Sequence, residues 1–339
     1  GMSMGILLRD LHFFYIGKAE DLPALPIQYR DAVLAEKDKL EEISDALLDF
    51  WKGSLSDAPC RIILPFASNR LTGSLGTADE CFLQLDDSLT SLVRGFSKKH
   101  GITTSATMLA VFYVLLYRYT GQKDAVVGIP VSGRTIPGTE NLIGYFVNTL
   151  PLRFILKDDI PFVELAGLLQ TELAKAISNQ ELPLETIART LGYRNGGANT
   201  LYNLMFSFQQ DLPAKVRLGE AEAVVSGLLT GGAKVDLLLE VQDNRRLCLR
   251  AEYDTTLFER RDIERFQGHY RDLLAACLKD VTAGVGTLNF FGEEDLSLVF
   301  SKSADYTNGD QGYSIYDMFR RQAAATPGTA ASRPPSRRR

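Results

Sequence analysis

The sequence predicts an α/β fold in which helices flank a mixed β-sheet. Residues 103–119 are apolar on nearly every face, which indicates a helix buried in the middle of a domain. Residues 125–129 form a short continuous apolar run, typical of a strand covered on both faces. Residues 235–241 and 247–253 predict two further strands, and the Gln-Asp-Asn segment at 242–244 has good turn chemistry between them.

The first part of the chain predicts two helices before the first strand. Residues 3–16 carry apolar side chains at three- and four-residue steps, followed by a glycine and two prolines, which predicts a short helix entering a connector. Residues 28–51 carry one long apolar stripe, so a second helix is expected there. Residues 81–85 suit a strand that leads into a helix capped by Asp86 or Asp87.

The rest of the chain continues this pattern. Residues 146–155 alternate as a strand does, with Leu152 on one face and Arg153 on the other. The other expected elements are a helix through residues 165–169, a strand over 201–208 and a last helix over 263–277.

Composition narrows the class of protein. The formal charge of −5, with acidic and basic residues mixed along the chain, argues against a nucleic-acid or anionic-membrane partner. The longest apolar stretch, residues 108–116, is well short of the roughly 20 residues that span a bilayer. The four cysteines are widely spaced with no CxxC pair, which predicts reduced thiols rather than disulfides or a zinc site. We therefore expect a cytoplasmic protein with no metal, no nucleic acid and no membrane.

No residue pattern identifies a catalytic site by itself. The chain holds three histidines, His12, His100 and His269, each in a context that suits a structural role. It contains no G-x-S-x-G elbow, Walker loop, HExxH or paired-carboxylate signature. Ser132-Gly133-Arg134 has glycine-loop character, but no helix signal follows, so a plain loop is predicted. These patterns indicate an α/β domain and leave its chemistry open.

Several segments nevertheless resemble the condensation domains of nonribosomal peptide synthetases. Residues 143–153, IGYFVNTLPLR, match the family segment IGxFVNTLPLR almost letter for letter. Looser matches are residues 26–33 to P-x-Q-Y-x-D-[YF]-A-x-W, 179–185 to HQDLPFE, 201–209 to PLFQVMFxxQ and 233–241 to AKFDLTLEV. The aromatic after Asp31 and the histidine at Asn179 of those patterns are missing here.

The two ends of the chain resemble parts of neighbouring segments in that family. Gly1 matches the last glycine of the catalytic signature HHxxxDG or is left from a tag, and Ser3 matches the serine that follows it. Both signature histidines and the aspartate would then lie upstream of residue 1. At the other end, residues 313–327 resemble SIHELFEEQAARTP, the opening of an adenylation domain.

This resemblance implies a domain organisation. Residues 1–27 would be a helix and connector from the N-terminal lobe, 28–300 the C-terminal lobe, and 301–339 a linker, the start of an adenylation domain and a disordered tail. The fold would be a chloramphenicol-acetyltransferase-like (CoA-dependent acyltransferase-like) lobe with a mixed sheet and flanking helices. The partners implied are peptidyl or acyl carrier protein domains, the missing N-terminal lobe and the adjacent adenylation domain.

The resemblance also implies a substrate tunnel. Carrier domains present acyl and aminoacyl thioesters on phosphopantetheine arms, and the condensation domain binds no cofactor of its own. The family's tunnel-lining residues map to Gly144, Asn148, Thr149 and Arg153. Asn148 interrupts an apolar strand face, so its amide has either a structural partner or a substrate contact. Arg153, on the opposite face, is expected to serve structure or to meet solvent.

Without the signature histidines, the resemblance implies a fragment that forms no amide bonds alone. Two alternatives stay open. A noncatalytic docking module for carrier proteins would need an exposed apolar patch rimmed by charge. A stand-alone acyltransferase would need an active site rebuilt around His12 or His269.

Overall fold

The computed structural model describes residues 2–59, 61–68, 76–157, 159–193, 201–210, 215–219, 221–224 and 231–288. All of these residues belong to one compact unit, Gly1–Phe290. The linker, adenylation start and tail predicted for 301–339 lie outside the described residues, as do Gly1 and Cys60.

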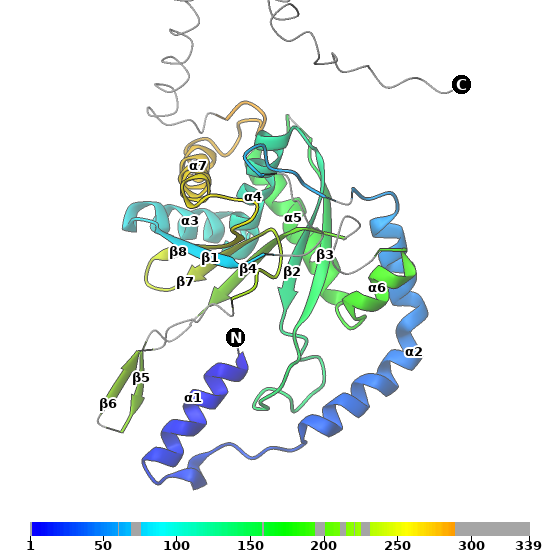
Figure 1. The fold of residues 1–339 in the computed structure, drawn as a ribbon, viewed down its shortest axis with the longest axis vertical. Helices are drawn as coiled ribbons and strands as arrows, with labels where there is room; N and C mark the ends of the chain where they lie inside the picture. Colours follow the sequence, from blue (N-terminus) through cyan, green and yellow to red (C-terminus); the bar gives the residue numbers. More distant parts are fainter. Residues whose placement is uncertain are drawn as a thin grey trace, which may run out of the picture. The chain divides into compact units, whose positions relative to one another are not determined.

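The described elements include helices at both ends and strands throughout (Figure 1). In chain order they are α1 (Met2–Tyr15), the short η1 (Ala19–Asp21), α2 (Tyr29–Leu55), β1 (Ala78–Gln84), α3 (Asp87–His100), α4 (Thr104–Thr120), β2 (Asp124–Val131), β3 (Asn148–Ile155), α5 (Phe162–Ser178), α6 (Leu184–Thr190), β4 (Leu204–Gln210), β5 (Lys215–Leu218), β6 (Ala221–Val224), β7 (Leu237–Asp243), β8 (Leu247–Asp254) and α7 (Arg260–Lys279).

The main sheet has the strand order β1-β8-β7-β4-β2-β3, and β5 and β6 form a separate hairpin. Strand β4 runs parallel to β7 and to β2, whereas the β1/β8, β7/β8 and β2/β3 pairs are antiparallel. The predicted mixed sheet is therefore confirmed. β3 is an edge strand, so the residues that lead into it lie at one margin of the sheet.

Helix α4 lies at the centre of the core because it is apolar all round, as predicted. Its residues from Ala106 to Leu116 are all buried. The Thr103 hydroxyl accepts from the N–H of Ala106 and caps the helix start. Two buried tyrosine hydroxyls find main-chain partners: Tyr113 donates to the carbonyl of Leu152 at 2.6 Å, and Tyr270 to that of Met108 at 2.6 Å. Helices α3, α5 and α7 pack beside α4 over one face of the sheet (Figure 1).

Most predicted elements are confirmed, with differences at turns and in short elements. Strand β7 pairs through Asp243 with Leu247, so the turn follows Asp243 and is not centred on it as predicted. Strand β3 begins at Asn148, two residues later than predicted. The sequence does not reveal α6 or the β5–β6 hairpin, because these elements are too short to show a clear period.

Within the described residues, no single helix is long and apolar enough to cross a bilayer. Helices α3 and α4 reach the length and composition only as a pair bent by 109°. Cys81, Cys248 and Cys277 are free thiols.

Candidate functional site

The start of α1 is joined to the loop between β2 and β3, which we call the 132–147 loop. The Ser3 hydroxyl donates to the carbonyl of Gly144 at 2.7 Å and lies 3.2 Å from the N–H of the same residue. Further along α1, Arg9 donates to the side-chain oxygen of Asn141 at 2.7 Å. Ser3, predicted from the catalytic signature, and Gly144, predicted from the tunnel, therefore lie together although 141 residues separate them.

Arg134 holds the 132–147 loop in shape. Its guanidinium donates to the carbonyls of Thr139 and Leu142 and, at 3.0 Å, to the hydroxyl of Ser3. The guanidinium carbon lies 4.3 Å from the centre of the Phe146 ring, a cation–π contact. Burial lowers the pKa of Arg134 from its ordinary value. The predicted plain loop at 132–134 is therefore an ordered loop with an arginine at its centre.

Two glycines permit the path of this loop. Gly133 has a φ of +62°, and a β-carbon there would lie 1.8 Å from the carbonyl oxygen of Phe146. A β-carbon on Gly144 would lie 2.4 Å from the ring of Tyr29. Tyr29, the first residue of α2, packs edge-on against Phe146 and donates to the carbonyl of Tyr145 at 3.0 Å. Gly144 is thus required by close packing between α2 and the loop.

The amide of Asn148 has four main-chain partners. Its nitrogen donates to the carbonyls of Gln180 and Leu182, both at 2.8 Å, and its oxygen accepts from the N–H groups of Thr149 at 2.9 Å and Leu184 at 3.2 Å. These bonds occupy every donor and acceptor position of a carboxamide. Asn148 therefore fixes the turn between α5 and α6 against the start of β3, which is the structural partner that the sequence left open.

Thr149 lies on the face of β3 opposite to Phe154, whose ring packs against Tyr113 of α4. Its neighbour is Tyr202, whose ring covers Gly128 so closely that a β-carbon there would lie 2.5 Å from it. Burial raises the pKa of Tyr202 to about 12, and a hydrogen bond with the Thr149 side chain acts in the opposite direction. The phenol therefore keeps its proton near neutral pH. Tyr202 was not singled out from the sequence, because a strand-leading aromatic there is typical of a core residue.

Arg153 lies at the far end of β3, apart from Gly144, Asn148 and Thr149. Its guanidinium makes a two-pronged ion pair with Asp124 at 2.9 and 2.6 Å and donates to the carbonyl of Ser56 at 2.6 Å. The hydrogen bond with Asp124 raises the pKa of Arg153. These contacts tie β2, β3 and the end of α2 together, in line with the expected structural role.

The three histidines are placed apart from one another. The Nδ1 of His12 lies 2.6 Å from the carbonyl of Arg217 in β5. The ring of His100 packs against that of Phe96, with 4.7 Å between ring centres and 42° between the ring planes. His269 lies 2.5 Å from the hydroxyl of Tyr119 in the core. None of these contacts forms the carboxylate-oriented imidazole that a general base uses.

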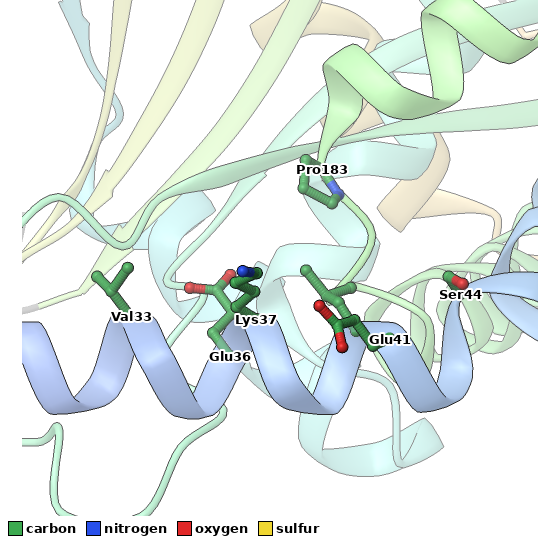
Figure 2. A pocket seen from close by; sticks show the side chains of 7 residues that line it. Val33, Glu36, Lys37, Glu41, Ser44 and Pro183 are labelled. Carbon is green, nitrogen blue, oxygen red and sulfur yellow. The ribbon is translucent and has the colours of Figure 1, made fainter.

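A shallow hollow of about 450 Å³ lies between α2 and the turn before α6 (Figure 2). Val33, Glu36 and Glu41 point into it from α2, and Pro183 faces them from the turn. Burial raises the pKa of Glu36. Beside the hollow, Lys39 pairs with Glu181 at 2.8 Å and ties α2 to the same turn that Asn148 holds.

Comparison with known proteins decides the family. The profile of the Condensation domain family matches residues 1–297. The chain belongs to the condensation domain family. Cyclosporin synthetase simA of Tolypocladium inflatum is 32% identical over 350 residues, which cover 98% of this chain and 2% of that protein. Surfactin synthase subunit 1 of Bacillus subtilis (strain 168) is 28% identical over 343 residues, which cover 96% of this chain and 9% of the synthase.

Solved condensation domains share the fold. The condensation domain from the Monacolin K polyketide synthase MokA superposes with a TM-score of 0.72 at 19% identity, covering 84% of this chain and 68% of the other. The four-domain nonribosomal peptide synthetase holo-AB3403, bound to AMP and glycine, gives 0.72 at 20% identity, covering 86% of this chain and 24% of that one. The predicted acyltransferase-like fold is confirmed. This condensation-domain chain spans less than a tenth of the length of either the cyclosporin or the surfactin enzyme.

Proposed function

We propose that this chain is the C-terminal lobe of a nonribosomal peptide synthetase condensation domain and forms one wall of an amide-forming site. Amide-bond formation is the function of the family that the chain belongs to. The substrates would be an acyl thioester and an aminoacyl thioester, each carried on the phosphopantetheine arm of a carrier protein domain. The amine attacks the thioester carbonyl, an amide C–N bond forms, and the carrier thiol leaves.

The contact between Ser3 and Gly144 carries this proposal. It sets the tail of the signature against the loop that leads to Asn148 and Thr149. Two segments that resemble active-site segments of the family are thereby neighbours, one on α1 and one at the edge of the sheet. A reacting centre at this junction gains from positioning of both substrates.

Within this wall, the residues have different roles. The Thr149 hydroxyl can bind a second group besides Tyr202, and we assign it a contact with substrate. Asn148 and Arg134 would act indirectly, because their polar groups are committed to the main chain and to Ser3. Arg153 would serve the fold, since it pairs with Asp124 well along the strand.

We also propose that the 339-residue chain alone forms no amide bonds. Aminolysis of a thioester gains typically about 10²–10⁴-fold from a positioned acid or base. None of the chain's three histidines stands in an HHxxxD sequence. The general base would come from an N-terminal lobe that carries this signature and covers α1, whose apolar residues Leu7, Leu11 and Phe14 are exposed.

The test is a condensation assay with loaded donor and acceptor carriers, followed by mass spectrometry of the product. We expect no amide product from the chain alone and measurable product when an N-terminal lobe carrying HHxxxD is added. Product from the chain alone that disappears in His12→Ala or His269→Ala would contradict the proposal and favour a rebuilt active site. Binding of both carriers without product, even after addition of the lobe, would favour a noncatalytic docking module.

A further inference from the structure

A second hollow lies on the helical side of the sheet, at the opposite end from the candidate site. It is a groove of about 640 Å³ between α3 and the end of α7. Helix α7 packs on β1, which is one edge strand, whereas the candidate site adjoins β3, the other edge strand. Figure 1 shows α3 and α7 side by side.

The surface of α3 in this groove has the shape of a helix-packing site. Leu92, Phe96 and His100 form a ridge at four-residue steps. Beside the ridge runs a second row of Ser91, Gly95 and Lys99, in which the first two side chains are small. A β-carbon on Gly95 would meet nothing within 4 Å. The ridge of another helix can therefore lie in this row and contact Leu92, whose side chain is 54% exposed.

One end of the groove is positively charged. Lys99 from α3 and Lys279 from α7 both line it, and within the described part of the chain neither has an ion-pair partner. The nearest acid in the lining, Asp280, accepts from the hydroxyl and the N–H of Thr282 at 2.7 and 3.1 Å. Arg94, on the adjoining face of α3, is already paired with Asp243 at 2.6 Å. The Asp280 carboxylate offsets one of the two ammonium groups, so the lining keeps a net positive charge beside an apolar floor and favours an acidic occupant.

We propose that the α3–α7 groove binds an amphipathic helix of a partner protein domain. This helix presents apolar residues at three- and four-residue spacing to Leu92 and the row through Gly95, and carboxylates to Lys99 and Lys279. The helix-in-groove mode recognises partners by such spaced anchors. The groove would give a condensation domain a docking surface that is separate from the seam where carriers deliver substrates, and the inference stands without the proposed activity.

The experiment uses the whole chain and a labelled synthetic peptide of about four helical turns, with leucines on one face and glutamates at one end. Fluorescence anisotropy measures binding, and methyl NMR reports contact at Leu92. We expect saturable binding that weakens at least about tenfold in Gly95→Gln, which fills the row, and in Lys99→Glu. Glutamine is a better helix former than glycine, so Gly95→Gln should keep the fold, as unfolding by urea will check.

Charge reversal provides the control. A peptide with lysines in place of the glutamates should bind Lys99→Glu more tightly than it binds the unaltered chain. Lys37→Glu, on exposed α2, should leave binding of the acidic peptide unchanged. Equal binding of both peptides, or no loss in Gly95→Gln, would overturn the proposal. If decanoate shifts the Leu92 signal and the peptide does not, the groove binds a small anionic amphiphile and the helix proposal is wrong.

Discussion

Helices α4 and α1 are similarly rich in apolar residues, but they differ in how much of that apolar surface is buried. All residues of α4 from Ala106 to Leu116 are buried, whereas α1 buries only Ile6. We call α1 together with the 132–147 loop the arm. The core around α4 is held by apolar burial, while α1 is held against the 132–147 loop by polar contacts from Ser3, Arg9 and Arg134.

This difference shows that stability and local geometry have different sources in this chain. Apolar burial contributes roughly 25 cal/mol per Å², so a large buried core can fold without help from the arm. A single hydrogen bond contributes about 0.5–1.5 kcal/mol net, so the few bonds between α1 and the 132–147 loop fix the position of α1 without adding much stability. Helix α1 also leaves Leu7, Leu11 and Phe14 exposed, the apolar surface that the proposed N-terminal lobe would cover.

The largest expected effect is on the free energy of unfolding, and it distinguishes α4 from α1 through one matched pair of variants. Leu109→Ala removes a fully buried side chain of α4 and should lower the free energy of unfolding by about 2–5 kcal/mol. Leu11→Ala makes the same chemical change on α1, where the side chain is 47% exposed, and should cost less than about 0.5 kcal/mol. Urea unfolding measures both. Similar losses in the two variants would break the comparison.

A smaller effect is expected where the arm meets the core. Asn148→Ala leaves two carbonyls and two N–H groups without partners and should cost about 1–3 kcal/mol. Asn179→Ala is the control, because its side chain makes one exposed bond to the carbonyl of Lys175. If the two variants unfold at the same urea concentration, Asn148 is not the structural tie described above.

The comparison also explains which elements and contacts could be predicted from the sequence. The apolar pattern of residues 103–119 predicted α4. The cap of α3, predicted at Asp86 or Asp87, lies at Asp86 and was visible because a helix start has its own local signature. The resemblance at 143–153 pointed to Gly144 and Asn148, but not to their partners. Those partners, at Ser3 and in the turn around residue 182, are brought together only by the fold, so no local pattern reveals them.

Arg134 sharpens the comparison within the arm. Arg134→Lys keeps the charge but loses the forked contact with Ser3 and two carbonyls, so α1 should open more often. We expect amide hydrogen exchange of residues 2–15 to speed up several-fold, with a change of less than about 1 kcal/mol in global stability. Arg94→Lys, which disturbs a surface pair with Asp243, should leave that exchange unchanged. An unaltered exchange rate in Arg134→Lys would contradict the role given to this residue.

The smallest effect concerns pH. Burial raises the folded-state pKa of Glu36 above its unfolded value. The protonated side chain therefore does not destabilise the fold below the unfolded pKa, and this favourable state is lost as pH rises through the raised pKa and the buried carboxyl becomes charged. Glu36→Gln should therefore stabilise the chain by less than about 0.5 kcal/mol at pH 7 and leave it unchanged near pH 4, since the group is partly solvated. Thermal unfolding at both pH values measures this, with Glu41→Gln as a control for net charge. A stabilisation that is the same at both values would contradict the assignment to Glu36.

Native-state hydrogen exchange of the unaltered chain tests the contrast between core and arm most directly. Amides of α4 should exchange only through global unfolding, at a free energy of about 5–15 kcal/mol, because its residues from Ala106 to Leu116 are all buried. Amides of α1 should exchange through local opening at about 0–3 kcal/mol and gain protection when an N-terminal lobe carrying HHxxxD is added. Protection of α1 equal to that of α4 in the chain alone would contradict the account, because the arm would then be part of the core.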